Sequence, residues 1–197
     1  LVGSEMCIRD RVWGYTEVNR VLDDLAPEHH GLTNNVLPQV EVDFVSYSSY
    51  DATNGNPETI RERLVKAITH IESKLRPRPG IKGRRVFIGE FGTTAAAAKT
   101  PEKFESLARN VFQAALELDC PLVLFWELYC NEFDKDGKHP GFWLIDDQGN
   151  KTTVHQTFCA YQRKAKAWVA EYVRVHGQVP DRESFRRRAL VILAQLP

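Results

Sequence analysis

The chain has 197 residues, of which 43% are hydrophobic and 10% aromatic, so it can bury a sizeable core and suits a single domain. Its 26 Lys and Arg residues balance its 26 Asp and Glu residues, which argues against nucleic acid and anionic membrane surfaces as partners. The longest apolar stretches, such as residues 121–126, are far shorter than the roughly 20 residues needed to cross a bilayer.

The first residues, LVGSEMCIRDR, show neither a hydrophobic period nor helix-capping residues, and they lack the apolar centre and cleavage site of a signal peptide. They are similar to the translated adapter sequence found at the ends of conceptual proteins from shotgun assemblies. We therefore expect residues 1–11 to be non-native and Trp13 to lie near the first genuine residue. The sequence leaves the cellular location open.

The four cysteines show neither a CxxC pair nor the His and Cys spacing of a zinc site. We therefore expect no metal site and no disulfide framework. The GxSxG, Walker and HExxH motifs are also absent from the sequence, which removes three hydrolase classes from consideration.

From about residue 37, strand and helix patterns alternate, as in βαβ units that form a parallel sheet. The first predicted strand covers residues 40–50. A helix follows, with Asn56 as its N-cap and Pro57 at its first position. Apolar residues recur every three or four positions of this helix as far as Leu75, which gives it one face to pack on a sheet.

The second predicted strand covers residues 84–89 and has Glu90 at its C-terminal end. The next helix opens at Thr100 and Pro101, which suit the N-cap and first positions. The third predicted strand, residues 121–126, is apolar on both faces, as expected for a parallel strand that is covered on both sides.

Residues 128–150 form a long loop with a short hairpin, and a loop of this length in a compact domain is usually functional. A helix is predicted from Thr153 to about His176, and a last helix near residues 181–195. Residues 177–197 are thus expected to be a helical extension.

The C-terminal ends of the three predicted strands bear SerTyrSerSerTyrAsp, GlyGluPheGly and TrpGluLeuTyr. Because side chains alternate along a strand, Val86, Ile88 and Glu90 are predicted to share one face, with Trp126 beside Glu90. A glycosidase needs a carboxylate near the anomeric carbon and benefits from an aromatic surface under the sugar ring. The pattern therefore favours a sugar-processing site.

These strand ends, with GlyPheTrpLeuIleAsp beyond them, resemble the last three strands of the clan A retaining glycosidases, the cellulase and mannanase superfamily. The resemblance implies an α/β fold in which residues 12–176 are the C-terminal portion of a (β/α)8 TIM barrel, about strands six to eight. It implies that Glu90 is the nucleophile, that Trp126 is a sugar platform and that Tyr50 hydrogen-bonds the nucleophile. Ser48 stands where the family has a histidine. The candidate substrate-binding residues are Tyr47, Ser48, Tyr50, Trp126, Tyr129, Asn131 and Trp143.

The family's acid/base glutamate follows an asparagine at the end of strand four, and nothing in residues 12–36 matches that pattern. Glu17 lies in a stretch that reads as helix, and Glu127 is predicted to point away from the site. We therefore expect the acid/base to lie upstream of this chain and the chain alone to be inactive, with Glu90 lacking a catalytic partner. Glu132 and Asp134 on the long loop are the only acids of this chain that could take the place of the missing acid/base.

The resemblance implies an intact parent enzyme that hydrolyses β-linked oligo- or polysaccharides with retention and without a cofactor. One alternative is a non-catalytic carbohydrate-binding barrel that keeps Trp126. Another is a β/α enzyme acting on phosphorylated metabolites, which would need a glycine-rich anion site after the last strands. The sequence there is TrpGluLeuTyrCysAsnGlu, which supplies aromatic and acidic residues instead.

Overall fold

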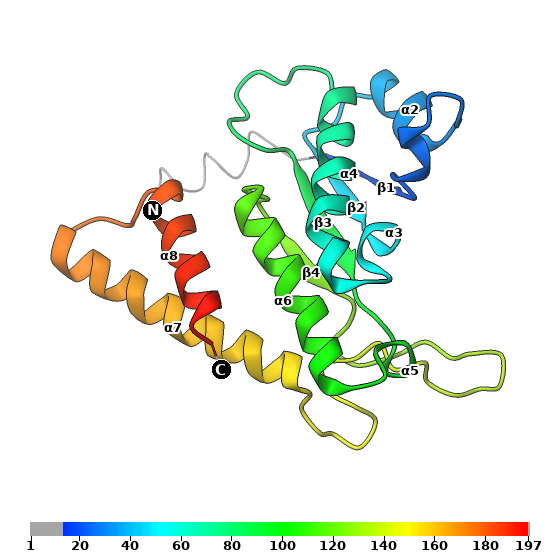
Figure 1. Ribbon diagram of the computed structural model, residues 1–197. Coiled ribbons are helices and arrows are strands. Elements are labelled where there is room, and N and C mark those ends of the chain that lie inside the picture. The colour runs from blue at the N-terminus through cyan, green and yellow to red at the C-terminus, as the bar shows by residue number, and fades with distance from the viewer. Residues whose placement is uncertain (1–13, 197) are drawn as a thin grey trace.

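The structure is a computed structural model that describes residues 14–196 (Figure 1). Within these residues, one parallel sheet of four strands has the order β1-β2-β3-β4. The strands are β1 (Tyr15–Asn19), β2 (Phe44–Ser48), β3 (Val86–Phe91) and β4 (Val123–Phe125). The α/β class and the parallel, sequential order of the three predicted strands are confirmed. The predicted leader at residues 1–11 and Trp13 lie outside the described residues.

Strand β1 corrects the prediction from the sequence, in which the segment around Glu17 is helical. This segment instead pairs in parallel with β2, from Tyr15 opposite Phe44 to Asn19 opposite Ser48. Tyrosine, threonine and valine favour extended backbone. The hydrogen bonds that β2 supplies make the strand more stable than a helix for this segment. The segment also fits a helical spacing of apolar residues, but the pairing with β2 outweighs that local preference.

The main helices are α4 (Ile60–Lys74), α6 (Pro101–Glu117), α7 (Thr153–His176) and α8 (Arg182–Ala194). The short ones are α2 (Leu32–Asn35), α3 (Tyr50–Thr53) and α5 (Ala95–Ala98), with 3-10 turns at Asp23–Leu25, Leu37–Gln39 and Pro57–Thr59. The predicted caps are present, since Asn56 accepts from Glu58 N–H and Thr100 accepts from Lys103 N–H. None of the described helices combines the length and apolar character that a membrane span needs.

Helices α4 and α6 lie on the same side of the sheet (Figure 1), and the main core fills the space between them and the strands. Its strand side chains include Val45, Tyr47, Val86, Ile88 and Phe91. The opposite face of the sheet is much less covered. Exposure of Tyr15 is 66%, of Leu122 55% and of Leu124 49% on that face. We call it the open face.

A β-bulge explains why Glu90 reaches the open face. Tyr47 pairs with Ile88, but the next residue of β2, Ser48, pairs with Glu90, so Gly89 is the extra residue. Val86 and Ile88 precede the bulge and face the helices, so Glu90 does not share their face, contrary to the strict alternation predicted from the sequence. The extra residue reverses the alternation and brings Glu90 to the open face.

Helix α8 is held against the C-terminal end of α6, whereas Thr157 of α7 donates to Glu105 near the start of α6 at 2.6 Å. Arg186 donates to the backbone oxygen of Glu117 at 3.1 Å, and Arg182 donates to the Asp119 carboxylate at 2.7 Å. Within the pair of helices, Trp168 lies against Tyr172 and Phe185. The arginines of α8 therefore fasten this helix to the sheet-covering layer.

Candidate active site

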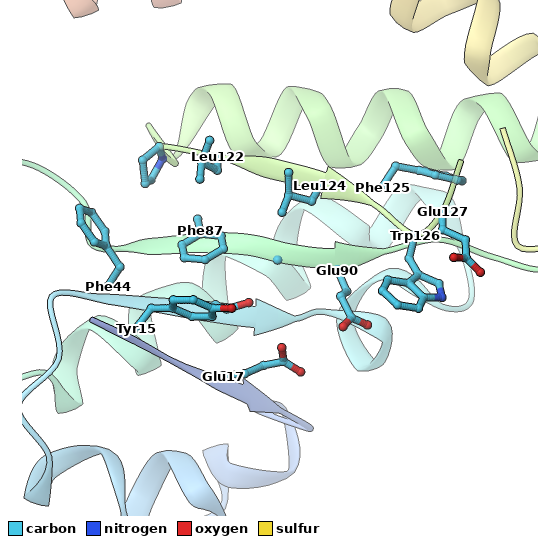
Figure 2. A pocket seen from close by; sticks show the side chains of 13 residues that line it. Tyr15, Glu17, Phe44, Phe87, Glu90, Leu122, Leu124, Phe125, Trp126 and Glu127 are labelled. Atoms are coloured by element: carbon cyan, nitrogen blue, oxygen red, sulfur yellow. The ribbon is translucent and has the colours of Figure 1, made fainter. Parts of the chain in front are cut away.

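A hollow of about 780 Å³ lies on the open face and runs toward the C-terminal ends of the strands (Figure 2). Its apolar part lies nearer the N-terminal ends of the strands, where Tyr15 packs edge-on against Phe87 with ring centroids 6.0 Å apart. The lining side chains near the C-terminal ends are Glu17, Glu90, Trp126 and Glu127. The hollow therefore joins an apolar floor to an acidic and aromatic end.

The half-buried Glu90 is fixed through both its side chain and its backbone. Ser48 donates from Oγ to Glu90 Oε2 at 3.2 Å. Ser49 donates from its backbone N–H at 2.8 Å and from Oγ at 2.9 Å, both to the backbone oxygen of Glu90. The hydrogen bond from Ser48 restricts the rotation of the Glu90 carboxylate.

Tyr50 is the second hydrogen-bond partner of the Glu90 carboxylate. Burial raises the pKa of Tyr50, and the negative charge of Glu90 and the hydrogen bond to it raise the pKa further. The charges of Glu132 and Glu127 act in the same direction. Tyr50 therefore keeps its proton and can donate it in a hydrogen bond to Glu90. The phenol ring is positioned by an edge contact with Phe142, with centroids 6.1 Å apart.

The two glycines of GlyGluPheGly permit close approaches on either side of Glu90. A Cβ on Gly89 would lie 1.8 Å from Ser46 Oγ, and a Cβ on Gly92 would lie 2.3 Å from the backbone oxygen of Trp126. The backbone N–H of Trp126 donates to the Phe91 oxygen at 2.8 Å. The absence of a side chain at Gly92 thus lets the end of β4 come close enough to place Trp126 beside Glu90.

The Trp126 indole lies next to the Glu90 carboxylate in Figure 2 and is half-buried, so one part of it faces the hollow. The peptide bond between Trp126 and Glu127 is cis. Glu127 is among the residues that line the hollow, but in Figure 2 its carboxylate lies beyond Trp126, on the side away from Glu90. Its Oε1 accepts a hydrogen bond from the backbone N–H of Asn131 at 3.2 Å, which ties the start of the long loop to the site.

Glu17 is the site residue that the sequence reading missed. Figure 2 shows the Glu17 and Glu90 carboxylates directed toward one another across the hollow. Partial burial raises the pKa of Glu17, and the negative charge of Glu90 raises it further. The expectation that only the loop acids Glu132 and Asp134 could face Glu90 is therefore wrong. The alternation of Tyr15, Glu17 and Asn19 around the buried Val18 was the signal available in the sequence.

The prediction that Tyr47 binds substrate is wrong. It is completely buried between the sheet and the helices, on the side away from the hollow. Its hydroxyl donates to Asp51 Oδ1 at 2.7 Å. Burial raises the pKa of Tyr47, and the charge of Asp51 adds to that effect. Tyr47 therefore supports the core and is not placed to touch a ligand on the open face.

The other predicted residues lie outside the hollow. Tyr129 is 58% exposed, and Asn131 is exposed on the long loop. Trp143 lines a separate hollow of about 320 Å³ beside the start of α6. Asp134 accepts the backbone N–H groups of Asp136 and Lys138, both at 2.9 Å, so its carboxylate holds a loop turn. These positions do not converge with Glu90.

Among residues 14–196, no group of three or more His, Cys, Asp or Glu side chains is arranged to hold a metal ion. The geometry instead offers two facing carboxyls beside an indole. No protein-family model, curated protein or solved structure matches the chain.

Proposed function

We propose that this chain is part of a retaining glycoside hydrolase, with Glu90 as the nucleophile. The observation that carries the proposal is the placing of Glu90 at a strand end. Ser48 and Tyr50 hold its carboxylate, which opens onto a hollow beside Trp126. A fixed carboxylate next to an aromatic face is the arrangement that glycoside chemistry needs.

The four parallel strands are consistent with half of a (β/α)8 barrel, because eight parallel strands close such a barrel and helices cover its outer face. On this proposal β1 to β4 correspond to strands five to eight, one strand more than the sequence analysis expected. The open face is then the side that faces the barrel interior. The catalytic groups stand at the C-terminal ends of the strands, as in other enzymes of that architecture.

In the proposed reaction, a β-linked sugar stacks on Trp126 and presents its anomeric carbon to Glu90. Glu90 attacks that carbon, the bond to the leaving oxygen breaks, and a glycosyl ester forms on Glu90. Water then cleaves the ester and restores the configuration of the starting sugar. The substrates are oligo- or polysaccharides, and the chemistry uses no cofactor.

Turnover of aryl β-glycosides tests the proposal, with Glu58→Gln as a matched control because Glu58 is an exposed acid outside the site. We expect the intact parent enzyme and its Glu58→Gln variant to release the chromogenic aglycone, and its Glu90→Gln variant to release none. Sugar binding by Glu90→Gln should persist, since stacking on Trp126 does not require the charge. Normal hydrolysis by Glu90→Gln contradicts the proposal, and binding without any hydrolysis by the wild type supports the non-catalytic carbohydrate-binding alternative.

A further inference from the structure

A second hollow, of about 620 Å³, lies beside the candidate active site. It is lined mainly by the segments that follow β2 and β3, so it lies at the same end of the parallel sheet as Glu90. Phe142 lines this hollow and packs edge-on against Tyr50, which hydrogen-bonds the Glu90 carboxylate. Two aromatic rings therefore link the second hollow to the proposed nucleophile. Its volume is within the range of small-molecule sites, about 300–1,000 Å³.

Positive charge lines this hollow without a matching acid. Lys99 and Lys103 are exposed and belong to its lining, and neither forms an ion pair with a residue that the structure describes. Glu58 and Glu102, the acids of the neighbouring turns, are not among the lining residues. The hollow, which we call the lysine hollow, therefore attracts anions.

Thr93 gives the lysine hollow a hydrogen-bond donor that the protein itself does not use. The residue is 7% exposed, and within residues 14–196 its hydroxyl has no hydrogen-bond partner. A buried hydroxyl without a partner costs free energy, and its position in the wall of a hollow leaves a ligand oxygen free to supply the missing bond.

Two amide side chains add further donors to the same lining. Asn56 accepts the backbone N–H of Glu58 through Oδ1 at 3.0 Å, which leaves its amide N–H groups for a ligand. Asn54 lines the hollow as well, and its backbone oxygen accepts a hydrogen bond from Arg63 at 2.5 Å. Arg63 also donates to the backbone oxygen of Asp51. The loop that presents both amides is therefore held in place from behind.

We propose that the lysine hollow binds a negatively charged group, a carboxylate or a sulfate, of the glycan that stacks on Trp126. This inference rests on the proposed function and narrows its substrates to acidic oligo- or polysaccharides. The two ammonium groups supply the charge, and the Thr93 hydroxyl and the two amides supply donors for the remaining oxygens of the anion. A neutral sugar gains no charge-assisted hydrogen bond there, so the lysine hollow distinguishes acidic from neutral glycans.

Single sugars test the site without any turnover, in a ¹H–¹⁵N NMR titration of the 197-residue chain. The probes are glucuronate, sulfated glucose, glucose and inorganic sulfate. We expect one or both of the acidic sugars to shift the amide signals of Thr93 and Lys103, and glucose to leave them unchanged. The acidic sugar that binds more tightly identifies the anionic group. Equal shifts with glucose, or shifts with inorganic sulfate but with neither acidic sugar, would overturn the inference.

Variants of the lining test the same point. The double variant Lys99→Gln with Lys103→Gln should lower the affinity for the tighter acidic sugar about tenfold or more. Lys82→Gln is the matched control, because Lys82 is an exposed lysine that precedes β3, at the opposite end of the sheet, and it should leave the affinity unchanged. Unchanged affinity in the double variant would overturn the inference.

Thr93→Val removes the unused donor and keeps the shape of the side chain. Because the hydroxyl has no partner in the free protein, we expect urea denaturation to show no loss of stability, while the affinity for the acidic sugar falls. A loss of stability with unchanged affinity would show that the hydroxyl serves the fold, and would overturn its part in binding.

A mechanism-based 2-deoxy-2-fluoro glycoside separates the two ways in which this can fail. Labelling of Glu90 without binding of either acidic sugar in the lysine hollow would overturn the acidic substrate alone. Binding in the lysine hollow without labelling of Glu90 would overturn the proposed function, and with it the assignment of the anion to a substrate glycan.

Discussion

The backbone oxygen of Trp126 occupies the space in which a Cβ atom on Gly92 would stand, 2.3 Å from its ideal position. The C-terminal ends of β3 and β4 therefore approach more closely than any side chain at Gly92 would allow. Trp126 is also joined to β3 by the hydrogen bond from its backbone N–H to the oxygen of Phe91, 2.8 Å long. The position of the indole beside Glu90 depends on this contact.

Replacing Gly92 with alanine should therefore displace Trp126. Because the obstacle is backbone and not the end of a flexible side chain, we expect the free energy of unfolding to fall by about 1–3 kcal/mol. Sugar binding should weaken at the same time. Gly14→Ala is the control, since the nearest atom to its added Cβ is 4.0 Å away. Urea denaturation and sugar titration measure both effects, and a Gly92→Ala protein with normal stability and binding would contradict the account.

Removing the hydroxyl of Tyr47 should affect stability, whereas removing the hydroxyl of Tyr50 should affect turnover. Tyr47→Phe removes a buried hydrogen bond to Asp51, so the free energy of unfolding should fall by about 1–3 kcal/mol while sugar binding is unchanged. Tyr50→Phe removes a hydrogen bond to the charged Glu90 carboxylate. A bond of that kind is worth about 1.5–3 kcal/mol, so turnover should fall about 10- to 100-fold.

Denaturation and turnover measured on both variants check this pair. A large loss of sugar binding in Tyr47→Phe at full stability would mean that Tyr47 contacts the ligand after all. Unchanged turnover in Tyr50→Phe would show that its hydroxyl does not support Glu90.

Trp126 and Trp143 should differ in their effect on sugar affinity. Trp126 lines the hollow with Glu90, whereas Trp143 lines the separate hollow beside α6. Trp126→Ala should weaken sugar binding by about tenfold or more, because aromatic contact is worth about 0.5–1.5 kcal/mol beyond the buried area. Trp143→Ala should leave the affinity unchanged. Calorimetric titration of an oligosaccharide compares them, and equal losses would place the sugar elsewhere.

Stability at acid pH should depend on Asp24, which is 2% exposed. Burial alone would raise its pKa, but the hydrogen bonds from His29 and Thr33 outweigh burial and lower the pKa below its ordinary value. A carboxyl with a lowered folded-state pKa adds stability above its unfolded pKa and loses that stability as the pH falls through the folded value. Urea unfolding should therefore show a gap between wild type and Asp24→Asn that is widest near neutral pH and shrinks below about pH 4. A constant gap would contradict this.

Hydrophobic periodicity and capping residues were enough to predict most of the helices and three of the strands. Thr100 and Pro101 mark the start of α6, and the helix predicted from Thr153 to about His176 is α7. Strand β1 was missed because its five residues also fit a helical spacing, and only pairing with β2 decides between the two. Local patterns do not contain that information.

The site was predictable only in part, for a geometric reason. The approach of Trp126 to Glu90 followed from neighbouring strands. Glu90 was predicted to share a face with Val86 and Ile88, which is wrong because the bulge at Gly89 has no clear sequence signal. Tyr47 was predicted to bind substrate because the pattern SerTyrSerSerTyrAsp at the strand end does not show which face of the sheet each residue occupies. Glu17 was overlooked together with the strand that carries it.

The central claim is that Glu90 bonds to the sugar. Incubating the protein with a 2-deoxy-2-fluoro β-glycoside that has a good leaving group, followed by peptide mass spectrometry, tests it most directly, because the fluorine slows hydrolysis of the ester. We predict one added fluoro-sugar on the peptide that contains Glu90, and none on the Glu90→Gln variant. A label on Glu17 or Glu127, or an unlabelled protein, would contradict the account.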